Sequence, residues 1–174
     1  MKKKILENLK TLFIAAVLAV IIRSLIIQPF YIPSSSMENT LLIGDRLFVT
    51  KYSYGYSRHS FPFSPKIMKS RLFYKEPKRG DVIVFKTPSD NRTDYIKRLI
   101  GIGGDEIQFI NGDLYINKKK ITKKFIRKDY VFCGSENIQV NIYREKINKN
   151  KEYEIAYFKK NSLSDTDPYI VPKK

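Results

Sequence analysis

Cysteine and histidine are almost missing from this chain. Among its 174 residues, Cys133 is the single cysteine and His59 the single histidine. One cysteine cannot form an intramolecular disulfide, and this pair cannot supply a Cys/His cluster for zinc. A Ser-His-Asp or Cys-His mechanism would have to run through His59 alone. The sequence therefore predicts no metal site.

Acidic residues are also few, since 17 Asp and Glu stand against 33 Lys and Arg and leave a formal charge of +16. Eight glycines and eight prolines are too few for collagen-like or low-complexity chains. The 43% of hydrophobic and 13% of aromatic residues suffice for a core, which argues against wholesale disorder. The length fits one domain of ordinary size with an appendage.

A long hydrophobic run is present near the N-terminus. Residues 1–10 are mostly basic, and residues 12–27 are apolar apart from Arg23 and one serine. At about 1.5 Å per residue this helix is roughly 24 Å long, shorter than a bilayer core of about 30 Å. It can span if Lys10 and Arg23 reach toward the headgroups. Pro29 is expected to stop the helix.

Three interpretations of this segment compete. A cleaved signal peptide needs a small-x-small site, whereas bulky and then proline-rich residues follow the apolar run. A buried helix of a soluble protein is the second interpretation, and an uncleaved signal anchor is the third. We favour the anchor, with a basic cytoplasmic N-terminus at residues 1–10 and a transmembrane span at 11–28. Everything after Gln28 then lies on the far side of the membrane.

Beyond Pro33 the periodicity changes from helical to two-residue alternation. Short β-branched or aromatic runs, bounded by turn residues, indicate strands around residues 47–49, 82–85, 95–100, 107–110 and 114–116. Asn111 and Gly112 predict a tight hairpin, because both tolerate positive φ. Residues 52–74 are expected to form a long loop ordered by aromatic side chains. The region 118–160 is expected to be peripheral β structure with a solvated basic face.

Two stretches could carry chemistry. The first is PFYIPSSSMENTLLIGD, in which the serines could simply form a turn or a helix cap. They directly follow the predicted anchor, however, which places them near the outer membrane surface. The second stretch is DYIKRLIGIGGDEI, in which alternation puts Lys97 on one strand face with Tyr95 and Leu99. Most lysines of a basic protein are solvated, but this one is expected on an apolar face.

These stretches, together with the strand segment RGDVIVF and the N-terminal anchor, resemble the type I signal peptidases. The likeness covers roughly residues 12–116 and continues more weakly to the end. It implies a mainly β fold, with an antiparallel β-sheet catalytic domain behind one N-terminal transmembrane helix. On this basis residues 29–117 are the predicted catalytic β core and residues 118–174 a peripheral β region.

The resemblance implies a membrane-bound serine endopeptidase with a Ser/Lys dyad. Ser36 matches the nucleophile, Lys97 the general base and Ser34 an oxyanion-hole donor. Such a dyad needs no histidine, and the resemblance implies no metal and no cofactor. A lysine amine accepts the serine proton only when neutral, so an apolar site must disfavour its charged form. Tyr95 and Leu99 are candidates for that apolar wall.

The implied substrates are the N-terminal signal peptides of exported preproteins, with small side chains at the first and third positions before the cut. Bulky walls that leave little room select small residues by exclusion. The other expected partner is membrane lipid, with no nucleic acid and no obligate oligomer. The implied location is the bacterial inner membrane, single-pass, with the N-terminus cytoplasmic and the catalytic domain periplasmic. The residues at the matching wall positions, for which plain core packing is the alternative, are Phe30, Ile32, Pro33, Met37, Leu41, Tyr95 and Ile96.

The match breaks in three places. The family usually has proline where this chain has Asn39 and where it has Gly103, changes expected only to loosen turns. Family sequences also continue into a Gly-Asp-Asn-Arg-Asp-Asn-Ser block that braces the base, whereas this chain reads DPYIVPKK up to Lys174. We therefore expect a truncated, frameshifted or degenerate member with little or no peptidase activity.

Two other functions fit parts of the sequence. A membrane-tethered basic protein that binds nucleic acid or anionic lipid would account for the charge of +16 and for tyrosines interleaved with lysines. Its affinity would not depend on Ser36 or Lys97. An inactive relative that still binds signal peptides is the second alternative.

Overall fold

The computed structural model describes residues 2–61, 64–65, 68, 70–133, 136–148, 150–157 and 165–173. The chain forms two compact units, each assembled from two separate stretches of sequence. The first, here called the anchor unit, comprises Met1–Tyr31 and Arg46–Glu76. The second, the site unit, comprises Ile32–Asp45 and Pro77–Lys174. The predicted division at residues 117 and 118 follows chain order and stays a prediction.

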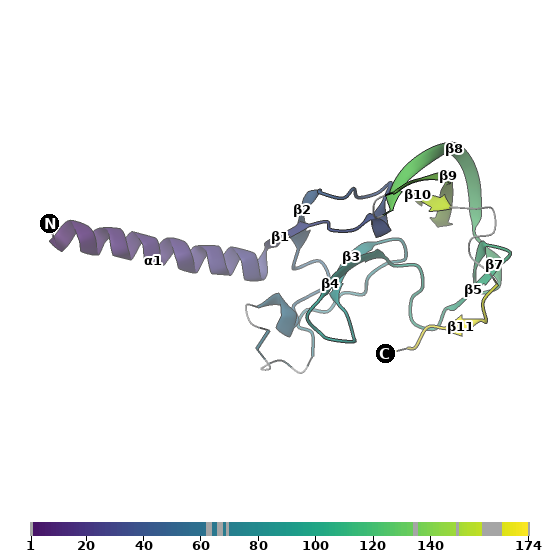
Figure 1. The fold of residues 1–174 in the computed structure, drawn as a ribbon. Coiled ribbons are helices and arrows are strands. Elements are labelled where there is room, and N and C mark those ends of the chain that lie inside the picture. Colours follow the sequence, from purple (N-terminus) through teal and green to yellow (C-terminus); the bar gives the residue numbers. More distant parts are fainter. Residues whose placement is uncertain are drawn as a thin grey trace. The chain divides into compact units, whose positions relative to one another are not determined.

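Within the described residues, the regular structure consists of one long helix, two single-turn 3₁₀ helices and antiparallel strands, as expected for this fold class (Figure 1). The helices are α1 (Lys2–Leu25), η1 (Ser35–Met37) and η2 (Arg58–Ser60). The strands are β1 (Ile27–Tyr31), β2 (Arg46–Thr50), β3 (Val82–Lys86), β4 (Asp94–Arg98), β5 (Glu106–Ile110), β6 (Asp113–Ile116), β7 (Lys119–Lys120), β8 (Thr122–Cys133), β9 (Glu136–Asn148), β10 (Lys151–Tyr157) and β11 (Tyr169–Ile170).

Helix α1 in the anchor unit is long and apolar enough to cross a membrane. Its 24 residues extend roughly 36 Å at about 1.5 Å each, because the helix already begins in the basic N-terminal segment. It ends at Leu25, earlier than the sequence predicted. Two donors meet the exposed carbonyls there, since Tyr56 Oη donates to Leu25 O at 2.9 Å and the Lys51 N–H donates to Ile26 O at 2.9 Å.

Pro29 lies within strand β1 rather than at the helix end, and this strand was missed by the sequence analysis. It pairs with Phe48 in the two-stranded ribbon β1–β2. An edge strand tolerates proline because one side of its backbone needs no sheet partner. Side chains alternate across this ribbon, so Tyr31 and Phe48 lie on one face, and they are 58% and 70% exposed. The ribbon that directly follows the helix thus presents aromatic rings to its surroundings.

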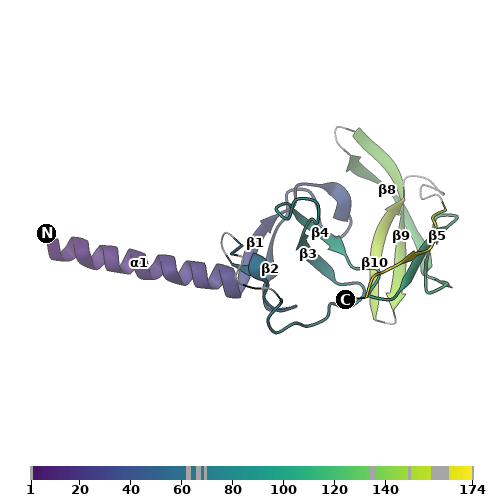
Figure 2. The same cartoon turned by 90° about the horizontal axis from the view of Figure 1, so that it is seen from below.

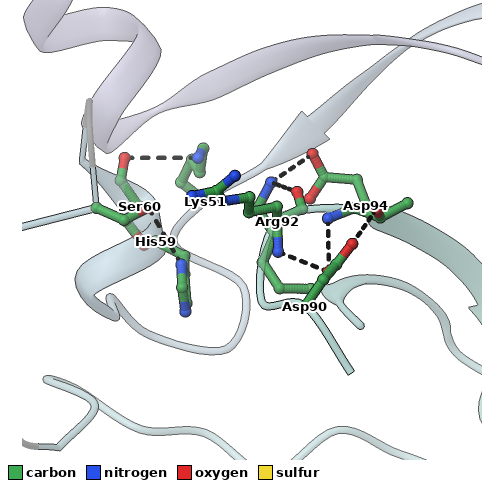
Figure 3. A network of polar contacts seen from close by, with 9 residues as sticks. Lys51, His59, Ser60, Asp90, Arg92 and Asp94 are labelled. Atoms are coloured by element: carbon green, nitrogen blue, oxygen red, sulfur yellow. Dashed lines mark hydrogen bonds and ion pairs between the residues drawn. The ribbon is translucent and has the colours of Figure 1, made fainter. Parts of the chain in front are cut away.

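The remainder of the anchor unit corresponds to the predicted long loop. A bridge between Tyr56 and Leu72 closes it, and η2 forms a single turn inside it. Lys51 Nζ donates to Ser60 O at 3.5 Å, a contact visible in Figure 3. Gly55 has φ +81, and a Cβ there would meet Leu72 O at 2.3 Å, so only glycine fits this crossing.

Strands of the site unit begin with two hairpins. In the first, β3 pairs with β4 so that Ile83 faces Lys97. In the second, β5 pairs with β6 through a turn in which Asn111 and Gly112 have φ of 51° and 75°, which confirms the predicted Asn-Gly hairpin. The first hairpin therefore places Lys97, the predicted general base, on the short strand β4.

The region after residue 118 forms the three-stranded sheet β8–β9–β10, seen side by side in Figure 2. Its inner face packs against β5 and β6 and provides the larger core of the site unit. The buried members of this core are Leu114, Ile116, Ile121, Ile147 and Tyr153. A smaller cluster of Val131, Val140 and Ile142 lies further along the same sheet. The expected peripheral strands therefore build the core of this unit.

Residues 165–173 run back along the site unit, where β11 pairs with β5. Gly103 and Gly104 let this segment approach closely, since a Cβ on Gly103 would lie 3.3 Å from Pro172 O. The Gly104 N–H donates to Val171 O at 2.8 Å. The change from the family's proline to Gly103 thus accommodates a neighbouring backbone as well as altering a turn.

The turn between β3 and β4 is held by Asp90 (Figure 3). Its carboxylate accepts the N–H of Arg92 at 2.8 Å, the N–H of Thr93 at 3.0 Å and the Thr93 hydroxyl at 2.5 Å. The Thr93 hydroxyl contributes most, and these bonds lower the pKa of Asp90 to about 2. Because the folded pKa lies below the ordinary value, the stabilisation exists above about pH 4 and disappears as pH falls toward 2.

We expect carbon-detected NMR titration of the full chain in micelles to give Asp90 a midpoint near 2. Thr93→Val should move this midpoint up toward the ordinary value of about 3.9, because it removes the hydroxyl donor. Thr93→Ser keeps that donor and serves as the control. Equal midpoints in the Val and Ser variants would contradict this account of the turn.

Candidate functional site

The loop 32–45 carries both predicted reactive serines, Ser34 and Ser36, and is closed at its base by backbone bonds. The Ile32 N–H donates to Asp45 O and the Gly44 N–H donates to Ile32 O, each at 3.0 Å. Asp45 also accepts the Leu42 N–H through its carboxylate at 2.8 Å. Ile32 is only 1% exposed. Backbone hydrogen bonds therefore hold the two ends of this loop together.

Within the loop, η1 presents Ser36 to solvent while the next side chain is buried. Met37 is 8% exposed and accepts backbone bonds from Thr40 and Leu41 at 3.0 and 2.8 Å. Ser34 precedes the turn in extended conformation, with φ −139° and ψ 152°. Its hydroxyl lies 3.3 Å from the Ser36 hydroxyl. Burial of Met37 thus orients the two hydroxyls to the same side of the turn.

Strand β4 brings Lys97 to the loop, and the Lys97 ammonium donates to Ser36 Oγ. The two residues are 61 positions apart in the chain, so only the packing of η1 on β4 joins them. This is the serine–lysine contact that a Ser/Lys mechanism requires.

The surroundings of this pair are only partly apolar. Tyr95 lies on the same face of β4, with its ring centroid 5.9 Å from Lys97 Nζ. That ring also packs edge-on against Phe85 at 6.1 Å. Lys97 is half-buried, whereas Ser36 and Tyr95 are exposed. The site is thus open to solvent on the serine side, and one predicted wall residue stands beside the amine.

The other predicted wall residues occupy different environments. Ile32 and Met37 are buried inside the loop, Leu41 and Ile96 are half-buried, and Pro33 is exposed. Phe30 belongs to β1 of the anchor unit, where it pairs with Leu47. The substrate-binding role of these positions stays a prediction.

A cavity of about 870 Å³ opens from the serine–lysine pair into the site unit. Its lining includes Ser34, Ser36, Met37 and Lys97. It also includes Thr40, Arg98, Glu145 and Tyr153, none of which the sequence analysis named as a catalytic or substrate-binding residue. Two sequence features could have drawn attention to these residues, namely the position of Arg98 next to Lys97 and the alternating pattern around Tyr153. Neither feature indicates that Arg98 and Tyr153 contact each other.

Several charged side chains of the β8–β10 sheet form ion pairs. Glu154 accepts from Arg127 at 3.0 Å and from Arg144 at 3.2 Å, and these bonds lower the pKa of Glu154. Lys146 lies 3.5 Å from Glu152. These ion pairs offset part of the positive charge of this sheet.

The apolar N-terminal helix fits a membrane-anchored protein, and the antiparallel strands with a serine–lysine contact match the class of fold that the sequence analysis expected. A family model described as "Signal peptidase, peptidase S26" matches residues 5–162. The chain belongs to this signal peptidase family, as the sequence motifs predicted. The family consists of serine peptidases.

Several curated relatives named Signal peptidase I come from Rickettsia. The protein of Rickettsia prowazekii is 39% identical over 166 residues, which cover 90% of this chain and 61% of the relative. That of Rickettsia typhi is 43% identical over 139 residues, or 78% of this chain and 51% of the relative. The chain thus spans between about half and three-fifths of these relatives' lengths.

Asn39 gives the loop a backbone conformation that proline cannot adopt. Its φ is +70°, whereas the proline ring holds φ near −65°. The departure from the family's usual proline therefore gives the chain after Ser36 a path that proline would not allow, and the expectation that it loosens a turn stays a prediction. Asparagine is among the few residues that visit this left-handed region readily.

Asn39→Pro should lower the thermal midpoint of the full chain in detergent, because an incompatible proline costs more than about 1 kcal/mol. It should also make the loop 32–45 more susceptible to limited proteolysis. Asn39→Gly, which retains access to positive φ, is the matched control and should unfold near the wild-type temperature. A proline variant as stable and as protease-resistant as wild type would contradict this geometry.

Proposed function

We propose that this protein is a membrane-anchored serine endopeptidase that removes N-terminal signal peptides from exported preproteins. The single observation that carries the proposal is the contact between Ser36 Oγ and Lys97 Nζ in a member of the signal peptidase family. In this proposal Ser36 is the nucleophile and Lys97 the general base.

The proposed reaction proceeds through an ester on Ser36. Neutral Lys97 accepts the hydroxyl proton as Oγ attacks the scissile carbonyl carbon. The resulting ammonium returns that proton to the leaving amine as the C–N bond breaks. Lys97 then takes a proton from water, whose oxygen attacks the ester and releases the carboxylic acid. The same amine returns a proton to Ser36, so the enzyme is restored.

Ser34 is the proposed oxyanion donor together with the Ser36 backbone N–H. Its hydroxyl lies 3.3 Å from Ser36 Oγ, which puts a donor next to the carbon that Oγ would attack. Negative charge develops on the carbonyl oxygen in the tetrahedral intermediate, and a donor held in place needs no reorganisation at that moment. The predicted selectivity for small side chains rests on the wall positions named from the sequence.

Acylation of Ser36 is the first chemical step of the proposed reaction and tests the roles of Ser36 and Lys97 directly. We expect an Ala-Leu-Ala p-nitrophenyl ester to acylate Ser36 of the full chain in lipid nanodiscs, detected by intact-mass and peptide mass spectrometry. Ser36→Ala should abolish the adduct, and Lys97→Met should slow its formation at least about 100-fold. Ser34→Ala should slow it about 100- to 1,000-fold.

Ser70→Ala and Lys128→Met are the matched controls, since each removes the same type of side chain from an exposed position outside the proposed site. Both should acylate at the wild-type rate. An adduct on another residue, or equal rates for wild type and Lys97→Met, would refute the Ser/Lys assignment. Binding of a signal peptide without acylation would favour the inactive, peptide-binding alternative.

We further propose a single-pass orientation in the bacterial inner membrane, with residues 1–10 cytoplasmic and the site unit periplasmic. Support comes from the basic start of α1 and from the exposed Tyr31 and Phe48 on the ribbon after the helix, since aromatic rings favour the membrane interface. Membrane lipid is accordingly a proposed partner of this ribbon.

The orientation can be measured with an epitope before Met1 and a second epitope after Lys174. Protease added to intact spheroplasts should remove the C-terminal epitope and leave the N-terminal one, because only the latter is behind the membrane. Lysed spheroplasts, in which both should disappear, provide the control. Loss of the N-terminal epitope from intact spheroplasts would reverse the proposed topology.

A further inference from the structure

Arg98, the residue after Lys97, joins three segments of the site unit. Its Nη1 donates to Gly80 O at 3.0 Å, and its Nη2 donates to Thr40 Oγ1 at 3.0 Å. Thr40 belongs to the loop that carries Ser36. Since successive strand residues point to opposite faces, this loop contacts β4 through Lys97 on one face and Arg98 on the other.

Tyr153 provides a platform for the Arg98 guanidinium. The Arg98 Cζ lies 4.3 Å from the centroid of the Tyr153 ring, within the range of a cation–π contact. Burial lowers the pKa of Arg98, while the neighbouring Tyr153 opposes that effect. A guanidinium nevertheless keeps its charge in proteins. The planar group can therefore stack on the ring and donate from its edge at the same time.

Glu145 holds the Tyr153 ring in place. Tyr153 and Glu145 are 9% and 3% exposed, and Tyr153 Oη donates to Glu145 Oε2 at 2.8 Å. Burial, and then the nearby Glu145 carboxylate, raises the pKa of Tyr153, so the phenol remains a donor. The ring is also part of the larger core. Tyr153 is thus fixed both by a buried hydrogen bond and by packing.

We propose that Tyr153, held by Glu145, is a positioning residue that fixes Arg98 and thereby sets the distance between Ser36 and Lys97. The Tyr153 ring contacts the Arg98 guanidinium, and this group donates to Thr40. Thr40 lies four residues after Ser36 in the same loop. This inference rests on the proposed function, because it assigns Tyr153 a role in the reactivity of Ser36. Neither Tyr153 nor Arg98 touches the reacting atoms in this scheme.

The test uses the acylation assay with the full chain in nanodiscs and separates the maximal rate from the half-saturating ester concentration. Tyr153→Leu should lower the maximal rate about 10- to 100-fold, because small misplacements of reacting groups are costly. The half-saturating concentration should change little, since Tyr153 is not proposed to contact the ester. Tyr153→Phe keeps the ring but loses the bond to Glu145, so its rate should lie between those of the wild type and Tyr153→Leu.

Thr40→Val removes the acceptor of the Arg98 bond and should also slow acylation. If both residues act through Arg98, the Thr40→Val/Tyr153→Leu double variant should be no slower than the slower single variant. Tyr143→Leu is the matched control. Its ring packs on Phe125 and Tyr157 in the same sheet, and its loss should leave the rate unchanged.

A wild-type rate for Tyr153→Leu, an equal loss in Tyr143→Leu, or multiplied losses in the double variant would each overturn the positioning role. Absence of acylation in the wild type would instead refute the proposed function. In that case the positioning role of Tyr153 is tested by the backbone amide NMR signals of the loop that carries Ser36. Tyr153→Leu should then shift the Ser36 and Thr40 signals more than Tyr143→Leu does, and equal or absent shifts would overturn it.

Discussion

The contact between Ser36 and Lys97 depends on how the loop 32–45 is held against strand β4. Backbone bonds between Ile32 and Asp45 close the loop at its base, and buried Met37 fixes η1. Arg98 then ties the far side of the loop to the strand through Thr40. The Ser36 hydroxyl and the Lys97 amine come from separate segments of the chain. Each of these contacts limits the movement of one segment against the other, and its loss would make the contact between the two groups less frequent.

The half-exposed state of Lys97 gives substrate binding a physical role in the proposed reaction. A peptide that lay over Ser36 and Lys97 in the proposed reaction would displace water from both groups, and electrostatic interactions are stronger where water is excluded. Tyr95 already shields one side of the Lys97 amine.

The basic composition has a different physical meaning from the one that a charge count suggests. On the β8–β10 sheet, the carboxylates of Glu152 and Glu154 pair with lysine and arginine on the outer face. The inner face supplies core side chains and the Tyr153–Glu145 pair. The same strands thus combine a solvated, mixed-charge surface with the packing that supports the reactive loop.

Local sequence determined the apolar helix, the Asn-Gly hairpin and the strand that bears Lys97, because each follows from periodicity or from the φ preference of a few neighbouring residues. The motifs around Ser36 and Lys97 also indicated the family and pointed to the two residues that the structure brings into contact. The exact helix end, strand β1 with its proline and the left-handed Asn39 were decided by tertiary contacts that local propensity does not contain. The same holds for Arg98 on Tyr153, since a contact between residues 55 positions apart depends on which faces the folded strands bury together.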